Sequence, residues 1–250
     1  MVDYTAYFIN GADREGQTVI ICDHATNTVP DFINNGDLGL PDTDMQRHIA
    51  YDIGALGVST HLAELLNAPL ISSNFSRLVI EPNRGEDDPT MVMKLYDGSI
   101  IPANRYMNDD DKIMRLEACY RPYHKALDQL LSDRNNPIII SIHSFTKQLN
   151  GYATRPWHIG VLYADDDRLA APLIAACRNQ NDICVGDNQP YNGKLKNDTM
   201  DRHALQHGRI HVLIELRNDL IETDKDQKLW AEKLAPIITQ AINETLSKET

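Results

Sequence analysis

Short apolar runs rich in β-branched residues alternate along the chain with longer stretches of helical periodicity. The runs lie at residues 18–22 (TVIIC), 68–72 (APLIS), 77–80 (RLVI), 137–143 (PIIISIH), 158–163 (HIGVLY) and 211–216 (HVLIEL). Their length and composition are typical of buried strands. Helical patterns cover residues 44–67, 109–133, 168–179 and 224–246. Pro122 predicts a kink or a break in the second of these helices.

This alternation predicts an α/β fold in which helices cover both faces of a mixed, mostly parallel sheet. Two stretches rich in Pro, Asn and Gly, residues 81–108 and 186–201, are predicted to be long loops. Long loops in a compact domain are often functional, so residues in both loops are candidates for a binding site.

Length and composition favour one soluble domain. A chain of 250 residues with 42% hydrophobic content predicts a single α/β domain over residues 1–250. The apolar runs are far shorter than the ~20 residues of a membrane helix, and the first residues lack the pattern of a signal peptide. The four cysteines occur singly, which suits a reducing compartment. We therefore expect a cytoplasmic protein.

The net charge limits the kinds of partner. It is −12, with 24 Lys and Arg against 36 Asp and Glu. Nucleic-acid binding needs a basic surface, so this composition argues against it. An anionic small molecule would have to meet a local cluster of arginines. We therefore expect a small-molecule ligand, with neither nucleic acid nor membrane as partner, and the sequence leaves homo-oligomer formation open.

Reactive side chains follow three of the predicted strands. His24 comes soon after residues 18–22, His143 ends residues 137–143, and Glu215 lies near the end of residues 211–216. The carboxyl ends of parallel strands meet at one edge of a sheet, where ligands bind in open α/β folds. Two imidazoles and a carboxylate at such an edge are typical of a hydrolytic zinc site, in which the carboxylate takes a proton from water.

A single histidine after a strand is more often a hydrogen-bonded loop residue than a metal ligand. The hypothesis therefore depends on the coincidence of all three residues. Of the remaining histidines only His158, at the start of residues 158–163, is placed where it could approach the same edge.

The third metal ligand is less clear from the sequence. If residues 44–67 form one helix, Asp52 shares a face with Met45, Ile49 and Leu56, which are apolar. A buried carboxylate is costly unless it is paired or binds a metal, which favours Asp52 as a ligand. The alternatives are that Asp52 pairs with an arginine, or that Asp42, Asp44 or Asn27 is the ligand instead.

Arginines flank the run at residues 77–80. Arg77 precedes it, and Asn83 and Arg84 follow it within residues 81–84 (EPNR). Guanidinium groups bind carboxylates through two parallel hydrogen bonds, so this segment can hold an anionic substrate and stabilise an oxyanion. Arg155 and Arg217 are further candidates for the same pocket. The alternative is that these arginines are solvated or salt-bridged.

Seven segments in the same order resemble the N-formylglutamate amidohydrolase family. They are residues 23–30 (DHATNTVP), 48–55 (HIAYDIGA), 76–84 (SRLVIEPNR), 143–146 (HSFT), 155–163 (RPWHIGVLY), 186–191 (GDNQPY) and 214–220 (IELRNDL). The resemblance covers nearly the whole chain. It implies a three-layer α/β/α arrangement similar to zinc exopeptidases, of the phosphorylase/hydrolase-like type, with zinc as cofactor.

The wider relatives of that family, the zinc carboxypeptidases and aspartoacylase, imply a role for individual residues. By this resemblance His24 and His143 bind zinc, Glu215 is the general base and Arg77 stabilises the oxyanion. Asn83 and Arg84 bind the substrate carboxylate. One departure stands out, because those relatives carry a zinc-binding Glu three residues after the first His, where this chain has Asn27.

The sequence therefore predicts a zinc-dependent hydrolase that removes a formyl or other small acyl group from an acidic amino acid. The resemblance favours N-formyl-L-glutamate as substrate and implies a place in histidine breakdown. One alternative is a deacylase of another N-acyl amino acid. Another, which the departure at Asn27 keeps open, is a metal-free binding protein with the same fold.

Overall fold

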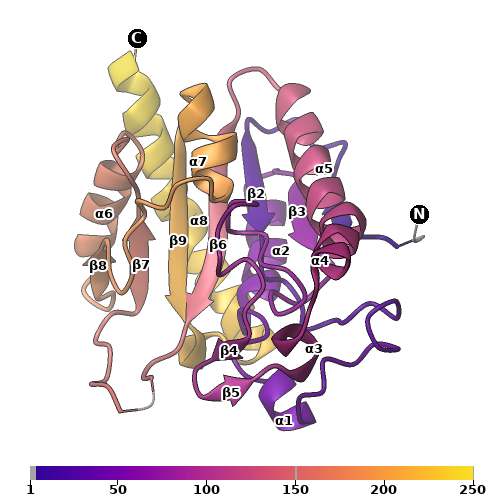
Figure 1. The fold of residues 1–250 in the computed structure, drawn as a ribbon. Coiled ribbons are helices and arrows are strands. Elements are labelled where there is room, and N and C mark those ends of the chain that lie inside the picture. Colours follow the sequence, from indigo (N-terminus) through magenta and orange to yellow (C-terminus); the bar gives the residue numbers. More distant parts are fainter. Residues whose placement is uncertain (1–3, 150, 250) are drawn as a thin grey trace.

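A seven-stranded mixed sheet forms the centre of the protein (Figure 1). The computed structural model describes residues 4–149 and 151–249. From edge to edge the strands are β1 (Tyr7–Asn10), β3 (Leu70–Ser73), β2 (Thr18–Cys22), β6 (Ile138–Phe145), β9 (His211–Arg217), β7 (Ile159–Leu162) and β8 (Val185–Asp187). The pairs β1–β3 and β7–β9 are antiparallel and the other pairs are parallel. The predicted mixed, mostly parallel α/β sheet is confirmed.

Helices cover both faces of this sheet. One face packs against α2 (Ala55–Leu65), α6 (Ala170–Arg178) and α8 (Asp224–Glu249). The other packs against the π-turn η1 (Leu116–Tyr120), α5 (Arg121–Ser132) and α7 (Thr199–His203). Successive strand residues alternate between the two cores, as with Ile139 on the α5 side and Ile140 on the α2 side. This two-residue period, buried on both faces, explains why the strands read as continuous apolar runs.

Shorter elements gather at the end of the molecule to which β6 and β9 point (Figure 1). They are α1 (Asp42–Met45), the hairpin of β4 (Leu95–Tyr96) and β5 (Ser99–Ile100), and α3 (Pro102–Arg105). The remaining elements are α4 (Asp109–Arg115) and the 3₁₀ turns η2 (Leu205–His207) and η3 (Asn218–Leu220). The predicted loop over residues 81–108 thus contains a hairpin and a short helix. The predicted loop over residues 186–201 ends in α7.

The predicted strand over residues 77–80 is wrong, because these residues form turns. Their apolar side chains are buried as expected, but side chains rather than a neighbouring strand satisfy the backbone. The Asn104 amide donates to the carbonyl oxygen of Leu78 at 2.8 Å, and the Arg115 guanidinium donates to that of Val79 at 2.8 Å. These two polar side chains supply the hydrogen bonds that a neighbouring strand would otherwise donate to the buried carbonyl groups.

The predicted continuous helix over residues 44–67 is also wrong in its first half. The chain leaves α1 after Met45 and enters α2 only at Ala55. Gly54 has a φ of 79°, a left-handed conformation that interrupts a helix. Asp52 therefore lies in the connection before α2, where its backbone N–H donates to the His24 carbonyl at 3.0 Å.

The other predicted helices are present with small shifts. The pattern over residues 109–133 forms one helical run of α4, the π-turn and α5, and Pro122 follows directly after the π-turn, so the predicted irregularity lies in the turn just before the proline. α6 and α8 correspond to residues 168–179 and 224–246. The short strands β1 and β8 and the β4–β5 hairpin are not predicted by the pattern. Among the described residues, no helix is both long and apolar enough to cross a membrane.

We predict that Gly54→Ala destabilises the protein more than Gly98→Ala. Both glycines have positive φ, but a Cβ at Gly54 would lie 2.2 Å from the Ile221 carbonyl oxygen, whereas one at Gly98 would meet nothing within 4 Å. Backbone strain costs about 1 kcal/mol at either position, and overpacking adds about 1–3 kcal/mol at Gly54. Urea unfolding of both variants measures the difference. Equal losses would show that the contact with Ile221 relaxes freely.

Candidate active site

The sheet brings the three predicted strand-end residues together. His24 follows β2, while His143 and Glu215 lie within the last residues of β6 and β9. β2 and β9 both pair with β6, and the parallel register places His143 directly beside Glu215. All three side chains are buried and line one pocket.

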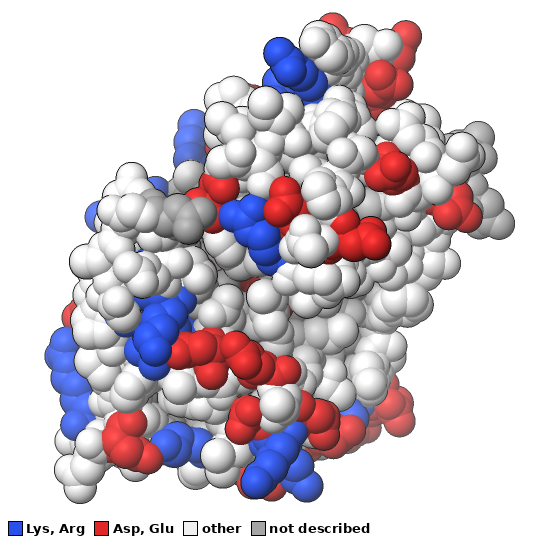
Figure 2. Space-filling view, turned by 90° about the horizontal axis from the view of Figure 1, so that it is seen from below, with Lys and Arg blue, Asp and Glu red and all other residues white. Residues whose placement is uncertain are grey.

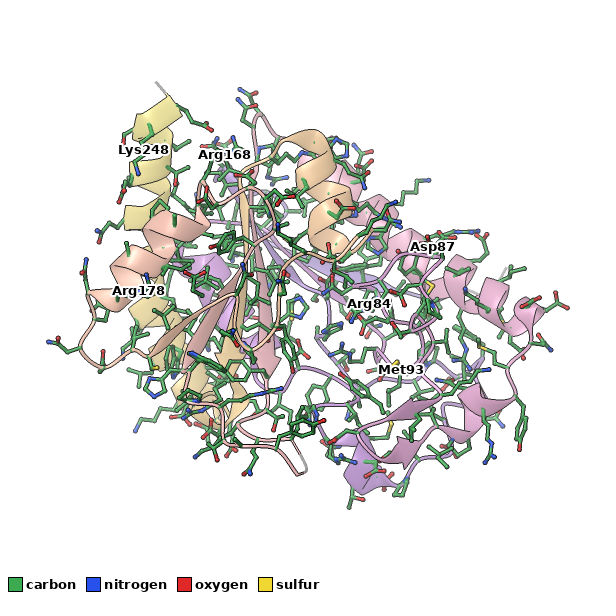
Figure 3. The ribbon with its side chains drawn as sticks, turned by 60° about the vertical axis from the view of Figure 1, so that its left-hand side comes forward. Arg84, Asp87, Met93, Arg168, Arg178 and Lys248 are labelled. Carbon is green, nitrogen blue, oxygen red and sulfur yellow. The ribbon has the colours of Figure 1, made fainter. Side chains whose placement is uncertain are left out.

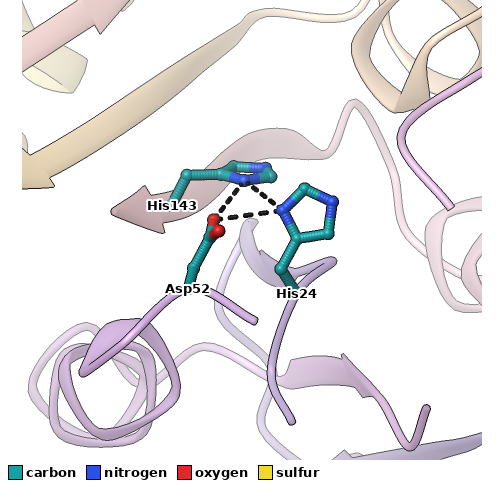
Figure 4. A group of neighbouring side chains, drawn as sticks. All are labelled: His24, Asp52 and His143. Atoms are coloured by element: carbon teal, nitrogen blue, oxygen red, sulfur yellow. Dashed lines mark hydrogen bonds and ion pairs between the residues drawn. The ribbon is translucent and has the colours of Figure 1, made fainter. Parts of the chain in front are cut away.

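His24, Asp52 and His143 converge through three ligand-type atoms (Figure 4). His24 Nδ1 lies 3.1 Å from His143 Nδ1 and 3.1 Å from Asp52 Oδ2. His143 Nδ1 lies 2.8 Å from the same oxygen. The Ser144 backbone N–H also donates to this oxygen at 3.2 Å, which helps to fix the Asp52 side chain. Among the described residues this group is the one whose donor atoms are close enough to share a metal ion.

The outward nitrogen of each imidazole faces a second buried carboxylate. His24 Nε2 donates to Glu81 Oε1, and His143 Nε2 lies 3.4 Å from Asp23 Oδ2. Histidines that bind metals usually carry such a carboxylate on the other ring nitrogen, where it fixes the tautomer and ring orientation. Both inner nitrogens are then free to offer lone pairs to a cation.

The cluster stabilises positive charge. Burial and the Arg77 charge lower the pKa of His24, but Glu81 and Asp52 outweigh them and leave it raised. Burial likewise lowers the pKa of His143, yet its contacts with Asp23 and Asp52 raise it well above the usual value. Burial raises the pKa of Asp52, but the two imidazoles leave it well below the usual value.

A tetrahedral zinc ion fits these donors. Zinc binds imidazole nitrogen at about 2.0–2.1 Å, so two ligand atoms of a tetrahedron lie about 3.3 Å apart. The three separations of 2.8, 3.1 and 3.1 Å are close to that value. Two imidazole nitrogens and one carboxylate oxygen are also a donor set that zinc accepts.

The other candidates for the third ligand lie outside the cluster. The Asn27 amide donates to the Met45 carbonyl at 2.8 Å. Asp44 accepts hydrogen bonds from Ser99 at 2.7 Å and from Arg47 at 3.1 Å, and Asp42 is exposed. The structure therefore brings Asp52, rather than these three, to the two histidines.

Glu215 is a buried carboxyl group without a hydrogen bond at Oε2. Burial raises its pKa to about 7. Gly160 lies opposite it in the antiparallel pair of β7 and β9, where a Cβ would come within 2.1 Å of the Gln189 carbonyl oxygen. The glycine thus lets the loop after β8 approach Glu215 closely. A carboxyl group that titrates near neutral pH is suited to accept and return a proton.

Arg77 connects the metal-type cluster, which consists of His24, Asp52 and His143, to the rest of the pocket. Its Nε donates to Glu81 Oε2 at 2.8 Å and its Nη1 donates to Asp52 Oδ1 at 3.2 Å. The guanidinium lies over the Tyr96 ring, 5.6 Å from its centroid, and it lines the pocket. Fixed by two carboxylates, this group offers its remaining donors to a ligand with little loss of side-chain freedom.

Asn83 and Arg84 line the same pocket. The Asn83 backbone N–H donates to Glu81 Oε1 at 3.0 Å, and its side-chain oxygen accepts from the Thr199 backbone N–H at 3.1 Å. Figure 3 shows Arg84 near the centre of the molecule, away from Arg168, Arg178 and Lys248. The Arg84 guanidinium donates to the Asn83 carbonyl at 2.7 Å, and Asp88 lies 3.9 Å from it.

Arg155, Arg217 and His158 are not among the pocket-lining residues. Arg155 stacks on Tyr191, which does line the pocket, and donates to the Thr146 carbonyl at 2.9 Å. Arg217 is paired with Asp219 at 2.7 Å. His158 accepts from the Cys184 backbone N–H at 3.1 Å.

The pocket has a volume of about 170 Å³ and is lined in part by both predicted loops. Tyr96 comes from the first loop, Tyr191 and Asp198 come from the second, and His48 completes the wall. On the face seen in Figure 2, basic and acidic side chains lie in small neighbouring groups. A larger groove of about 820 Å³ near Arg14 and Arg134 contains none of the predicted site residues.

Two residues around the metal-type cluster, Asp23 and Glu81, were missed by the sequence analysis. Each had a usable signal, since Asp23 directly precedes His24 and Glu81 follows three apolar residues. The argument that a buried carboxylate needs a partner, which identified Asp52, applies equally to Glu81.

Comparison with known proteins points to one family. The family model described as N-formylglutamate amidohydrolase matches residues 16–222. The crystal structure of a gene product from Agrobacterium tumefaciens is 31% identical, with a TM-score of 0.91 over 98% of this chain and 97% of that one. An N-formylglutamate amidohydrolase from Ralstonia eutropha is 16% identical, with a TM-score of 0.70 over 94% of this chain and 98% of that one. The latter similarity concerns the fold. No curated protein matches the chain.

We predict that zinc stabilises the protein and that Asp52→Asn weakens this effect far more than Asp44→Asn or Asn27→Ala. A ligand at 100 times its Kd adds about 2.7 kcal/mol to the free energy of unfolding. Asp52→Asn removes the anionic ligand and keeps the side-chain shape. Zinc titrations followed by thermal unfolding and chelator competition measure the change. The assignment fails if Asp52→Asn retains wild-type zinc affinity while one of the other variants loses it.

Proposed function

Because the chain belongs to the N-formylglutamate amidohydrolase family, we propose that it is a zinc-dependent hydrolase that cleaves N-formyl-L-glutamate to formate and L-glutamate. The observation that carries the proposal is the convergence of His24, Asp52 and His143 beside a buried Glu215. The pocket of about 170 Å³ suits a small amino-acid derivative.

In this proposal His24, His143 and Asp52 hold the zinc ion. When bound, zinc acts as a Lewis acid and lowers the pKa of water towards ~7. Asp23 and Glu81 hold the two imidazoles in orientation, through the contacts at their outward nitrogens.

Glu215 moves the proton. It accepts a proton from the attacking water and returns it to the nitrogen of the leaving amino acid. Its position beside His143 in the sheet and its pKa of about 7 support both transfers near neutral pH. The acyl carbon–nitrogen bond breaks as the amine is protonated, which releases formate and glutamate.

Arg77 and the Asn83–Arg84 segment bind the anionic parts of the substrate. Arg77, held by Glu81 and Asp52, stabilises the negative charge that develops on the acyl oxygen. Asn83 and Arg84 bind a carboxylate of the amino acid. Arg155 acts indirectly by supporting Tyr191 at the pocket wall, and Arg217 by fixing the turn at Asp219.

A deacylase of another N-acyl amino acid, such as N-acetyl-aspartate, is the second candidate. The machinery above cleaves an amide without selecting the acyl group, so the two candidates differ only in how the pocket wall fits the substrate. The metal-free binding protein is less well supported. This chain has Asn27 where the wider relatives carry a zinc-binding Glu, but Asp52 offers a third ligand atom in its place.

We predict that Glu215→Gln lowers kcat by about 10²–10⁴-fold, the usual contribution of a general acid–base, while zinc stays bound. The amide keeps the side-chain shape but cannot accept a proton. Steady-state kinetics with N-formyl-L-glutamate, together with metal analysis of the same sample, measure both effects. Glu222→Gln, an exposed change of the same type, is the control. Unchanged turnover in a zinc-loaded Glu215→Gln protein would rule out this mechanism.

We also predict that Arg84→Met lowers kcat/KM for N-formyl-L-glutamate about ten- to hundredfold, the scale of a lost hydrogen bond to a charged group. N-formyl-L-glutamine and N-formyl-L-isoglutamine each lack one carboxylate. The effect of Arg84→Met should vanish for the analogue that lacks the carboxylate bound by Arg84. Arg178→Met, which lies far from the pocket, should change nothing (Figure 3).

Substrate choice follows from the same assay. If wild-type protein hydrolyses all these compounds equally, Arg84 does not select a carboxylate. If N-acetyl-L-aspartate is the best substrate, the second candidate replaces the first.

A further inference from the structure

Three buried side chains on α5 and the end of η1 face the active site from behind. Tyr120, Tyr123 and His124 follow the i, i+3, i+4 spacing of one helical face, and both tyrosines are fully buried. The π-turn η1 ends at Tyr120. A π-turn contains one residue more than an α-turn, so it rotates the following helix by about 100° relative to a continuous α-helix. This rotation contributes to the direction in which the three side chains point.

Tyr123 contacts the metal side of the site. Its hydroxyl donates to Asp23 Oδ1 at 2.7 Å, and the other oxygen of Asp23 lies 3.4 Å from His143 Nε2. Asp23 is completely buried, and Tyr123 is the hydrogen-bond donor to its Oδ1. The tyrosine hydroxyl therefore anchors the carboxylate that lies at ion-pair distance from His143.

Tyr120 and His124 contact the substrate side. The Tyr120 hydroxyl donates to the Arg84 carbonyl at 2.6 Å, and His124 Nε2 donates to the Pro82 carbonyl at 3.0 Å. A carbonyl only accepts, so the proton of His124 is on Nε2 and its Nδ1 accepts. The donor to Nδ1 is His203 Nε2, at 2.9 Å. Both flanks of Asn83 are thus held by buried side chains.

α7 completes this support from the other side. The Thr199 backbone N–H donates to the Asn83 side-chain oxygen. The oxygen end of the amide therefore points toward Thr199, and its NH₂ end points away from it. His203 lies on the same short helix and holds His124. The backbone around Asn83 and the direction of its amide are therefore fixed by four buried residues outside the pocket chemistry, which are Tyr120, His124, Thr199 and His203.

We propose that Tyr123 is a positioning residue for the metal ligand His143, acting through Asp23, and that Tyr120 with His124 are positioning residues for Asn83 and Arg84, acting through the backbone of Pro82 and Arg84. One helix face thereby aligns the two halves of the site. This inference rests on the proposed function, because it takes His143 as a zinc ligand and Asn83–Arg84 as the carboxylate-binding pair.

Tyr123→Phe and Tyr120→Phe form a matched pair that tests the inference. Each variant removes one hydroxyl from a fully buried tyrosine of the same segment. Tyr123→Phe is expected to weaken zinc binding up to about tenfold, the lower end of what loss of an outer-shell partner costs, with little change in KM. Tyr120→Phe is expected to raise KM for N-formyl-L-glutamate about three- to tenfold, the scale of one neutral hydrogen bond, with unchanged zinc affinity.

The measurements are chelator competition for zinc and steady-state kinetics on the zinc-loaded protein. Tyr106→Phe, at a strongly exposed position, is the control and should match wild type in both. If either variant fails to fold, Asp23→Asn replaces Tyr123→Phe and His124→Leu replaces Tyr120→Phe, with the same split expected.

A purely structural role would lower the stability of both variants without separating zinc affinity from KM. Such a result, or a split in the opposite sense, would overturn the inference. Failure of the proposed function would look different, since the wild-type protein itself would then lack zinc-dependent hydrolysis.

Discussion

The central constraint on this structure is the burial of negative charge. Asp23, Asp52, Glu81 and Glu215 carry buried carboxyl groups around the candidate site, and the Arg77 guanidinium pairs with two of them, Asp52 and Glu81. Burying an ionised carboxylate is costly unless it is paired or binds a metal. The two imidazoles provide part of the compensation by holding protons more tightly than usual, and a divalent cation between their inner nitrogens would supply more. The fold is arranged to bring these compensating groups together.

The sequence predicted the parts of the site that depend on the sheet. Buried strands have a fixed two-residue period and parallel strands end at one edge, so residues that follow apolar runs can be placed without knowing the helices. His24, His143 and Glu215 were found in this way, and the register of β6 and β9 places the last two side by side. The α/β class followed from the same alternation.

The parts that depend on long-range side-chain hydrogen bonds were not predictable. Residues 77–80 look like a strand because they are apolar, and nothing nearby in the chain reveals that Asn104 and Arg115 bind their carbonyl groups instead. Asp52 was selected because a buried carboxylate needs a partner, and that argument holds. The helix on which its burial was inferred does not form, since the chain becomes helical only after Gly54. Asp23 was missed because its partners, Tyr123 and His143, lie on other elements, whereas Glu81 was missed although its partner Arg77 is only four residues away.

The two halves of the site differ in how they are built. In the metal-type half, His24 and His143 lie on or directly beside strands, whose positions are fixed by the sheet ladder and the two cores, and Asp52 is tied to them through its backbone hydrogen bond to His24. The substrate half lies in turns, and buried hydrogen bonds from η1, α5 and α7 to the backbone of residues 82–84 and to the Asn83 side chain help to hold its shape. Turn residues can change without disturbing a sheet ladder. Substrate preference can therefore change in this fold through the turn and its supports while the amide-cleaving groups stay in place, which is why the family alone does not decide the acyl amino acid.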